Sequence, residues 1–554
     1  MNKYIFIIFI SITIYLLTDI SSKNSYENFS RIPILFDGKI RPLNSFSKSI
    51  FNDLELKHKE YSHIKLLADL LLNFENFSQL KIFNIKYKNL INNFDLKENK
   101  NNYYSFDDIA NAIKKNYKII NALQNIDYDN RTIEQNEIIK LYYKITYLLK
   151  LKNYFPENLY NKNIKPKTQN NDINIQPFYI IPLSDTKWIE PESLISHNLK
   201  NEYTFLIVNI IDEMQKSYKK NDIELWSKIC KNFSNITLNN ISRYNKIKVQ
   251  TEYLYNKFNF IYISLIFYII GLITSILSNV LKRNINIYML SIVLAIFFNL
   301  SEIIFRIFLS ERAPVTNLYE SIVFVNCITA IFFIILYQKI KINPMFIIFI
   351  TLFQYITYKY SINGTNIKNL VPVLNTNFWL VSHVITITLG YSLCLISGLL
   401  AHIYLYFRLD FYKNTYFLKK FLNLIHLFII LSLIFSFCGT VLGGVWADQS
   451  WGRFWGWDPK ENGAMLIILW LTFIIHLRMV KTSNTLLYIN GIILNNIIVF
   501  LAWFGVNLLN VGLHSYGFTQ NVGFGLIMFL IFEICYILTF QIIFNIKKIK
   551  NTYL

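Results

Sequence analysis

The feature that most constrains this chain is a succession of long apolar runs in its C-terminal half, separated by short polar loops. A helix needs about 20 apolar residues to cross the hydrocarbon core of a membrane, and most of these runs are that long. The runs cover residues 258–281, 285–309, 318–337, 344–358, 378–407, 421–441, 463–480, 488–509 and 522–544. The run over 344–358 is the shortest of them. The sequence therefore predicts an all-α polytopic membrane protein.

The residues before these runs have a different character. Residues 4–17 form a short apolar run after Lys3, and we expect an uncleaved transmembrane anchor over residues 1–20, with a cleaved signal peptide as the alternative. Residues 21–257 are polar and contain no long apolar run. Either form of the N-terminus places them outside the cytoplasm. We expect three parts: the anchor, an extra-cytoplasmic domain over 21–257 and a membrane domain over 258–554.

The extra-cytoplasmic domain is predicted to be mostly helical. Apolar residues recur at helical spacing in 64–74 and 134–151. Residues 31–50 carry proline and Asp-Gly turn signals ahead of a helix, and residues 176–194 favour extended segments with turns. The histidines of this domain lie in polar surroundings without a partner pattern, and we interpret them as surface residues: His58, His63 and His197.

The distribution of charge predicts the orientation. The formal net charge of +20 would suggest a nucleic-acid partner in a soluble protein. Here the basic residues recur in short loops between apolar runs, as the positive-inside rule requires. If residues 21–257 lie outside, these residues all fall inside: Lys282, Arg283, Lys339, Lys341, Arg408, Lys413, Lys419, Lys420, Arg478, Lys481, Lys547 and Lys548. We predict about ten transmembrane helices in the inner (cytoplasmic) membrane of the cell, and no nucleic-acid partner.

One segment between two of the runs is rich in tryptophan. Residues 445–461 read VWADQSWGRFWGWDPKE. Tryptophan prefers headgroup depth in any membrane protein, so lipid anchoring is one interpretation. Flat indoles on a flexible backbone also form a platform for a planar ligand, and Arg453 and Lys460 could meet carboxylates on it. Haem has a flat macrocycle and two propionates.

We therefore predict a haem platform at the membrane surface, built on an aromatic loop or on a helix that lies flat. Its predicted residues are Trp446, Trp451, Arg453, Trp455, Trp457, Asp458 and Lys460. Asp458 and Glu461 are also expected to cap the helix that follows, because negative charge is favourable at a helix N-terminus.

These residues resemble a known family. WGRFWGWDPKE is similar to the tryptophan-rich WGxxWxWDxKE (WWD) signature of the haem-handling proteins that attach haem to c-type cytochromes. Within that superfamily the chain resembles the CcsA-type, CcsBA-like subunit of the System II cytochrome c synthase. Further similar segments are FWLVSHV with His383, VGLHSYGF with His514, and APVTNLYES over 313–321. The resemblance extends from Phe258 to Phe544.

The resemblance implies haem b as substrate and ligand. The family's outer haem ligands correspond to His383 and His514, and two neutral imidazoles can fill both axial positions of haem iron. His476 matches a histidine within the membrane and implies an inner haem site. The partner of that histidine usually belongs to a CcsB-type portion, and the run over 4–17 contains none. Either His402 or His426 replaces it, a partner subunit supplies it, or the inner site has one protein ligand.

A pair of opposite charges lies within one predicted span. Glu302 and Arg306 are four residues apart, so they can neutralise each other on one helix face. We interpret the pair as structural support. A contact between Arg306 and a haem propionate is the alternative.

The predicted function is cytochrome c biogenesis by a synthase of the haem-lyase type. Haem moves from the cytoplasmic side past His476 to the platform, where its vinyl groups meet the CxxCH thiols of an apocytochrome c. Positioning of the two reactants supplies most of the catalysis, and no side chain is expected to act as an acid or base. The five cysteines include no CxxC pair, so separate thiol-reducing proteins are expected partners, as is a CcsB-type subunit. The alternatives are a haem exporter without ligase activity, a System I haem-handling subunit and a non-enzymatic assembly scaffold.

Overall fold

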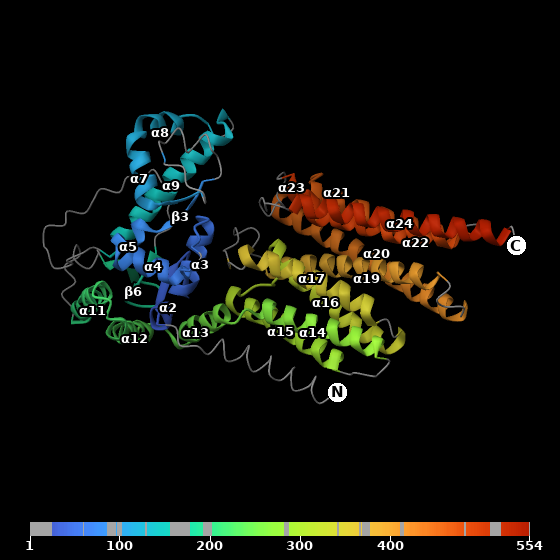
Figure 1. The fold of residues 1–554 in the computed structure, drawn as a ribbon, viewed down its shortest axis with the longest axis horizontal. Coiled ribbons are helices and arrows are strands. Elements are labelled where there is room, and N and C mark those ends of the chain that lie inside the picture. The colour runs from blue at the N-terminus through green and yellow to red at the C-terminus, as the bar shows by residue number, and fades with distance from the viewer. Residues whose placement is uncertain are drawn as a thin grey trace. The chain divides into compact units, whose positions relative to one another are not determined.

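A computed structural model describes residues 25–58, 60–85, 96, 102–127, 130–155, 178–191, 202–281, 287–340, 343–364, 367, 377–409, 415–480, 484–509 and 522–552. The chain divides into two compact units between Phe258 and Asn259. We call them the N-terminal unit and the membrane unit, and Figure 1 colours them from blue to green and from green to red. The predicted anchor over residues 1–20 lies outside the described residues.

The described residues of the N-terminal unit form three small antiparallel sheets. β1 (Pro33–Phe36) pairs with β2 (Lys39–Pro42) and with β5 (Phe178–Tyr179). Asp37 and Gly38 join β1 to β2 with φ of 53° and 69°, which is the backbone that a two-residue hairpin turn requires. The other sheets pair β3 (Lys81–Asn84) with β4 (Tyr103–Ser105), and β6 (Ile181–Pro182) with β7 (Trp188–Ile189). The turn and extended segments predicted from the sequence are therefore confirmed.

Helices supply most of the core of this unit. They are α2 (Glu27–Ser30), α3 (Leu43–Asp53), α4 (His63–Leu72), α5 (Phe74–Gln79), α7 (Phe106–Lys115), α8 (Tyr117–Gln124), α9 (Ile133–Asn153), α11 (Glu202–Lys219), α12 (Ile223–Asn239) and α13 (Arg243–Lys257). Helices α4 and α9 confirm the two predicted from apolar spacing. His63 is only partly exposed: its ring stacks on Phe51, with the two ring centroids 6.1 Å apart.

The described part of the membrane unit is helical. Its helices are α14 (Phe260–Val280), α15 (Ile287–Ser310), α16 (Leu318–Ile340), α17 (Asn343–Gly364), α18 (Asn377–Trp379), α19 (Ile385–Phe407), α20 (Thr415–Trp451), α21 (Pro459–Met479), α22 (Thr485–Phe500), α23 (Val506–Leu508) and α24 (Val522–Thr552). Two π-helical turns interrupt this series: η3 (Leu380–Val384) runs into α19, and η4 (Leu501–Gly505) follows α22.

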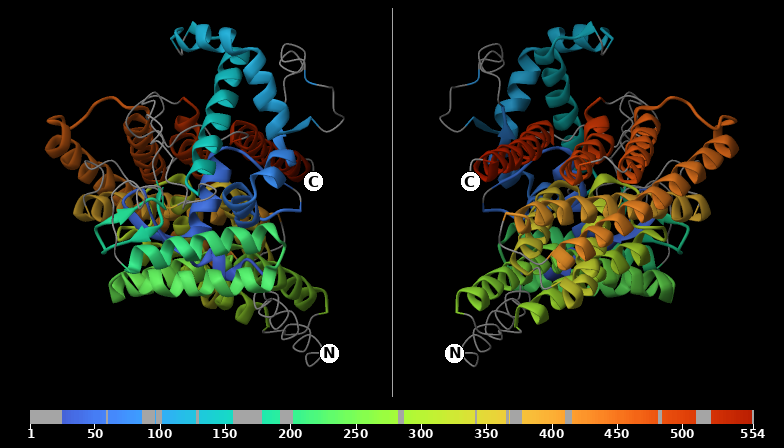
Figure 2. Two further views of the ribbon diagram at one scale, coloured as in Figure 1. Left: turned by 90° about the vertical axis from the view of Figure 1, so that its left-hand side faces the viewer. Right: turned by 90° about the vertical axis from the view of Figure 1, so that its right-hand side faces the viewer.

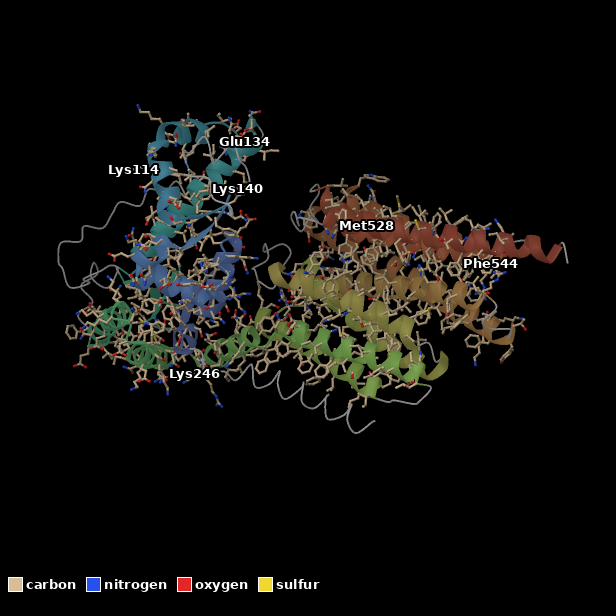
Figure 3. All side chains as sticks on the ribbon, in the orientation of Figure 1. Lys114, Glu134, Lys140, Lys246, Met528 and Phe544 are labelled. Carbon is tan, nitrogen blue, oxygen red and sulfur yellow. The ribbon has the colours of Figure 1, made fainter. Side chains whose placement is uncertain are left out.

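Eight helices in the described part of the chain are long and apolar enough to cross a membrane. They coincide with eight of the predicted runs and confirm an all-α polytopic membrane protein. Their outward faces carry large apolar side chains, such as Met528 of α24, which is 52% exposed. In Figure 3, Met528 and Phe544 lie along α24, whereas the labelled side chains of the N-terminal unit are charged.

Helix α17 occupies the shortest predicted run but is not among these eight. It carries polar residues that the bundle buries. The Gln354 amide is fully buried and donates to the Ile261 carbonyl and to Asn299 Oδ1, each at 3.1 Å. The Asn326 amide donates to Gln354 Oε1. These bonds connect α14, α15, α16 and α17, which lie beside one another in Figures 1 and 2.

Helix α19 is the central helix of the membrane unit. It packs against α16, α20 and α22, and 78% of its most apolar stretch is buried, against 17% for α24. Glycines bring α19 and α20 into close contact. An added Cβ would lie 2.6 Å from Ser436 Oγ at Gly390, and 2.9 Å from the Ile387 backbone at Gly439. Small residues at such crossings let helix backbones approach closely.

Candidate functional site

The tryptophan segment begins as helix and continues as a loop. Helix α20 extends through Trp446 to Trp451, so of the two predicted alternatives the loop is wrong for these residues, which are helical. The helix ends where Gly452 adopts φ of +67° and its N–H donates to the Asp448 carbonyl at 2.8 Å. Glycine favours such a left-handed helix end because it lacks a Cβ. The loop proper is therefore shorter than predicted and spans residues 452–458.

A capping box closes this loop. Asp458 is the N-cap of α21, Pro459 is the first helical residue, and Glu461 completes the box. Glu461 Oε2 accepts from the N–H groups of Gly456 at 2.7 Å and of Asp458 at 3.1 Å. The predicted capping roles of Asp458 and Glu461 are confirmed. Glu461 also holds the loop against the helix through the N–H of Gly456, a role beyond the predicted capping.

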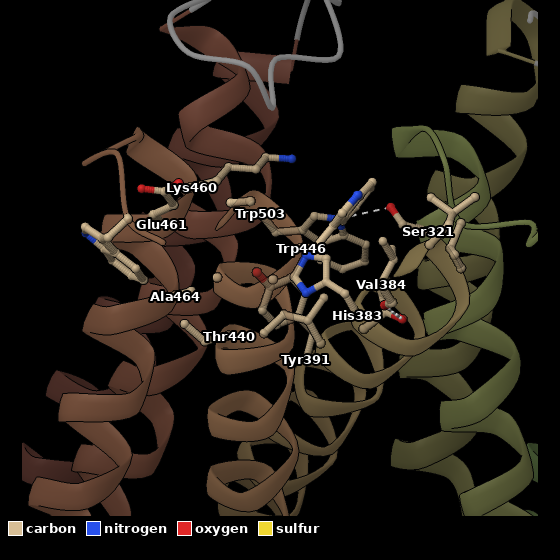
Figure 4. Close-up of a pocket in the computed structure, with 18 of the residues that line it drawn as sticks. Ser321, His383, Val384, Tyr391, Thr440, Trp446, Lys460, Glu461, Ala464 and Trp503 are labelled. Atoms are coloured by element: carbon tan, nitrogen blue, oxygen red, sulfur yellow. Dashed lines mark hydrogen bonds between the residues drawn. The ribbon is translucent and has the colours of Figure 1, made fainter. Parts of the chain in front are cut away.

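A cavity of about 160 Å³ lies where α19, α20, α21 and η4 meet. Predicted residues line it: His383, Trp446, Trp451, Trp455 and Lys460. Three other predicted platform residues, Arg453, Trp457 and Asp458, do not line it. Trp457 is 69% exposed, and the guanidinium of Arg453 lies against Gly456. Figure 4 shows His383 and Trp446 on one side of the cavity and Lys460 on the side of α21.

The imidazole of His383 is held in a defined orientation. Its Nδ1 lies 2.8 Å from the carbonyl oxygen of Gly439, which precedes Trp446 on α20 by about two helical turns. A carbonyl can only accept, so Nδ1 carries the proton and Nε2 is the basic nitrogen of the neutral ring. The ring centroid is 6.0 Å from that of Trp446. Metal-binding histidines commonly have this arrangement, in which a carbonyl accepts from the other ring nitrogen and so fixes the tautomer.

The other histidines that the structure describes in the membrane unit do not gather at this cavity. His514 lies outside the described residues. His476 is exposed near the end of α21 that is remote from the cavity, and its Nδ1 contacts the Thr472 carbonyl at 2.8 Å. His426 Nδ1 meets the Tyr488 hydroxyl at 3.0 Å. His402 Nε2 lies 3.0 Å from Glu533 Oε2, and its Nδ1 contacts the Gly398 carbonyl.

Arg306 has a closer partner than the predicted one. Its Nη1 is 3.8 Å from Glu302 Oε1, so the predicted pair exists. However, Arg306 Nη2 and Nε lie 2.7 Å and 3.0 Å from Glu320 Oε1 on the next helix. The Arg306 side chain is 1% exposed and does not line the cavity. The structural role is thus supported, and nothing in this arrangement supports the alternative contact with a propionate.

The cavity also contains residues that sequence analysis missed. Trp503 of η4 and Tyr391 of α19 form part of its lining, as do Val315 and Thr316. The last two belong to the segment APVTNLYES, which was noted only as a resemblance. Trp503 and Tyr391 lie inside apolar runs, where an aromatic residue carries no sign of a ligand contact.

Together, the helical bundle and the aromatic cavity define a multi-pass membrane protein with a candidate ligand site among the described residues. Comparison with known proteins agrees with this class. The family described as "Cytochrome C assembly protein" matches residues 315–514. Relatives named "Cytochrome c biogenesis protein CcsA" include that of Phaseolus vulgaris, which is 29% identical over 46% of this chain and 93% of its own length. The Helianthus annuus protein is 31% identical over 38% of this chain and 79% of its own length. The Solanum tuberosum protein is 34% identical over 38% of this chain and 78% of its own length.

The chain belongs to the CcsA family of cytochrome c biogenesis proteins. The resemblance inferred from the tryptophan motif is therefore confirmed at the level of the family. The relatives carry the CcsA name, so the alternative of a System I subunit has no support among them.

Proposed function

We propose that this protein binds haem b at the aromatic cavity and presents it for covalent attachment to an apocytochrome c. The observation that carries this proposal is the geometry of His383. Its Nδ1 is fixed by the Gly439 carbonyl while the ring stands beside Trp446. An oriented neutral imidazole next to an indole surface suits an iron-containing planar macrocycle.

The size and charge of the cavity fit a partly enclosed haem. A volume of about 160 Å³ is below the roughly 300–1,000 Å³ of sites that enclose a whole small ligand. The cavity would therefore hold one part of the macrocycle and leave another part outside. Lys460 lines the cavity, and its protonated form would pair with a propionate. An exposed edge is what the thiols of a second protein need to reach.

The chemistry of attachment requires positioning more than acid–base groups. Each cysteine thiol of the CxxCH motif adds its sulfur and its hydrogen across a vinyl double bond, so no electrons are lost or gained. Holding the vinyl and thiol groups together removes the entropy cost of their encounter. His514 is proposed as the second axial ligand, which the histidine of the cytochrome motif would replace when the product leaves.

A second proposal concerns the route of haem to this site. His476 is exposed on α21 among exposed apolar residues such as Leu469 and Phe473, so haem dissolved in the bilayer could reach it. His426 contacts Tyr488 and His402 lies beside Glu533, on other helices. We therefore favour a CcsB-type partner subunit, rather than His402 or His426, as the source of a second ligand at the inner site.

The orientation proposed for the membrane unit places the cavity on the extra-cytoplasmic side of the inner membrane. The described basic residues at the opposite end support it: Arg408 follows α19, Lys419 and Lys420 lie in the first turns of α20, and Arg478 lies in the last turn of α21. Arg478 donates to the Leu422 carbonyl and to Asn423, which shows that these helix ends lie together. Basic residues favour the cytoplasmic face. The N-terminal unit would then lie outside.

Absorption spectroscopy of the full-length protein, purified in detergent, tests the proposed function. A bis-histidine b-type haem spectrum is expected. Coexpression with an apocytochrome c should yield covalent cytochrome only when the protein is present. Haem binding without covalent product would favour a haem exporter, and a protein that takes up no haem would overturn the proposal.

A further inference from the structure

One wall of the cavity comes from Trp503, in the π-helical turn η4. The Trp503 side chain is almost fully buried yet lines the cavity. Other aromatic rings surround it: the centroids of Phe504, Tyr391 and Phe500 lie 4.7 Å, 5.9 Å and 6.3 Å from its own. These contacts restrict the ring to one place, so that it presents a rigid surface to whatever enters the cavity.

A hydrogen bond fixes the orientation of this ring. The indole N–H of Trp503 donates to Ser321 Oγ at 3.1 Å, drawn as a dashed line in Figure 4. A buried tryptophan usually requires such a partner for its N–H. Ser321 is 4% exposed and lies in the first turns of α16. The bond connects η4 to α16 across the cavity wall.

A buried ion pair in turn holds the start of α16. Glu320, the neighbour of Ser321, accepts from Arg306 of α15 and from both the N–H and the hydroxyl of Thr316. Thr316 lines the cavity. A buried charge that is paired and hydrogen-bonded resists displacement, because separating the pair would leave a charge unsolvated. The network therefore places both Ser321 and Thr316 at the cavity.

We propose that Trp503 directly contacts the planar ligand of the cavity, and that Ser321 is the positioning residue that sets its angle. This inference rests on the proposed haem function and adds a contact outside the tryptophan motif. The two π-helical turns support it. η3 carries His383 and η4 carries Trp503, and both side chains reach the same cavity. Such turns occur frequently at functional sites, since they redirect side chains from a regular helix.

Fluorine NMR of the full-length protein, labelled with fluorotryptophan, tests the contact. Gallium protoporphyrin IX serves as the probe because it is planar and diamagnetic, and its ring current shifts nearby resonances. The variants Trp503→Phe and Trp470→Phe identify the resonances of these two tryptophans, because each substitution removes one resonance. Trp470 is a matched control, since its indole N–H is also bonded, to the Gly491 carbonyl at 2.9 Å, and it does not line the cavity. We expect the Trp503 signal to shift by more than its linewidth and the Trp470 signal to stay.

Ser321→Ala provides a second measurement that does not depend on replacing Trp503. It should move the Trp503 signal in the ligand-free protein and weaken porphyrin binding roughly two- to tenfold. Ser264→Ala, which removes a buried hydroxyl bonded to the Ala295 carbonyl, should do neither. If the signals of Trp446, Trp451 or Trp455 shift while that of Trp503 does not, the inference is wrong and the proposed function stands. If no tryptophan signal responds to the porphyrin, both are overturned.

Discussion

His383 is the residue on which the candidate site depends most. Its orientation follows from close helix packing, because the carbonyl that fixes it belongs to Gly439 and an added Cβ at Gly439 would meet α19 at 2.9 Å. A side chain at Gly443 would also collide with the imidazole, at 2.6 Å from Cε1. Two glycines of α20 therefore create the space in which this histidine stands.

Replacing His383 by alanine should raise the Kd for haem at least about tenfold, or 1.4 kcal/mol, because the iron loses an axial ligand. Added imidazole should partly restore binding by filling the same position. Titration of the purified protein with haem measures both effects. His426→Ala is the matched control, since His426 contacts Tyr488 instead of the cavity. Unchanged affinity in His383→Ala would remove this residue from the site.

The tryptophans of the motif are expected to differ in their effects. Trp451→Phe and Trp455→Phe should each lower haem affinity roughly two- to tenfold, because both residues line the cavity and phenylalanine offers less stacking area. Trp457→Phe should be nearly silent, since that side chain is 69% exposed and lies outside the lining. Haem retention in membranes distinguishes the three variants. Unchanged haem retention in all three variants would instead favour lipid anchoring of the segment.

At the scale of elements, the start of α21 determines the shape of the tryptophan loop. Glu461→Ala should destabilise the loop and the first turn of α21 by about 1 kcal/mol, because the N–H groups of Gly456 and Asp458 lose their acceptor. Hydrogen exchange of residues 452–462 should accelerate accordingly. Glu461→Gln retains one acceptor oxygen and should have a smaller effect. Equal exchange rates in the wild-type protein and Glu461→Ala would show that the loop is held by other contacts.

The stability of helix α4 in the N-terminal unit should depend on pH. Burial, with smaller contributions from Lys48 and Lys57, lowers the pKa of His63 to about 4 from 6.5. The unfolded chain therefore binds a proton below pH 6.5 that the folded unit does not take up until about pH 4. Stability should fall as the pH drops through this window. Hydrogen exchange of α4 measures it, and His63→Gln should flatten the pH dependence. An identical profile in His63→Gln would assign the effect to other groups.

At the scale of the whole molecule, His383 and His476 lie at opposite ends of the membrane unit's helices. The cavity lies at the N-terminal end of α21, and His476 lies near its C-terminal end. His476→Ala should lower the haem content of protein made in cells, while haem added afterwards should still fill the cavity. His426→Ala should leave haem content unchanged. If His426→Ala also lowered the haem content, the second ligand of the inner site would come from this chain. Normal cytochrome maturation in His476→Ala would exclude the proposed route of haem past His476.

The sequence was sufficient for the class of fold and for part of the site. Apolar runs long enough to cross a membrane have few alternatives to helices, so the positions of eight spans could be predicted. The pattern Asp458-Pro459 with Glu461 specifies a helix start through local hydrogen bonds alone. Likewise, Trp446 and Trp451 could be selected from their place in the tryptophan motif, and the family resemblance added His383.

Tertiary structure decided what depends on contacts between distant residues. The continuation of α20 through Trp451 depends on where Gly452 turns the chain, and which tryptophans reach the cavity depends on that turn. Arg306 pairs most closely with Glu320, fourteen positions away on the next helix. Trp503 lines the cavity because η4 packs beside α21 and the indole N–H bonds to Ser321, 182 positions away. Apolar periodicity predicts that a helix face is buried but does not indicate which element packs against it. That partner is determined only by the tertiary packing of the bundle.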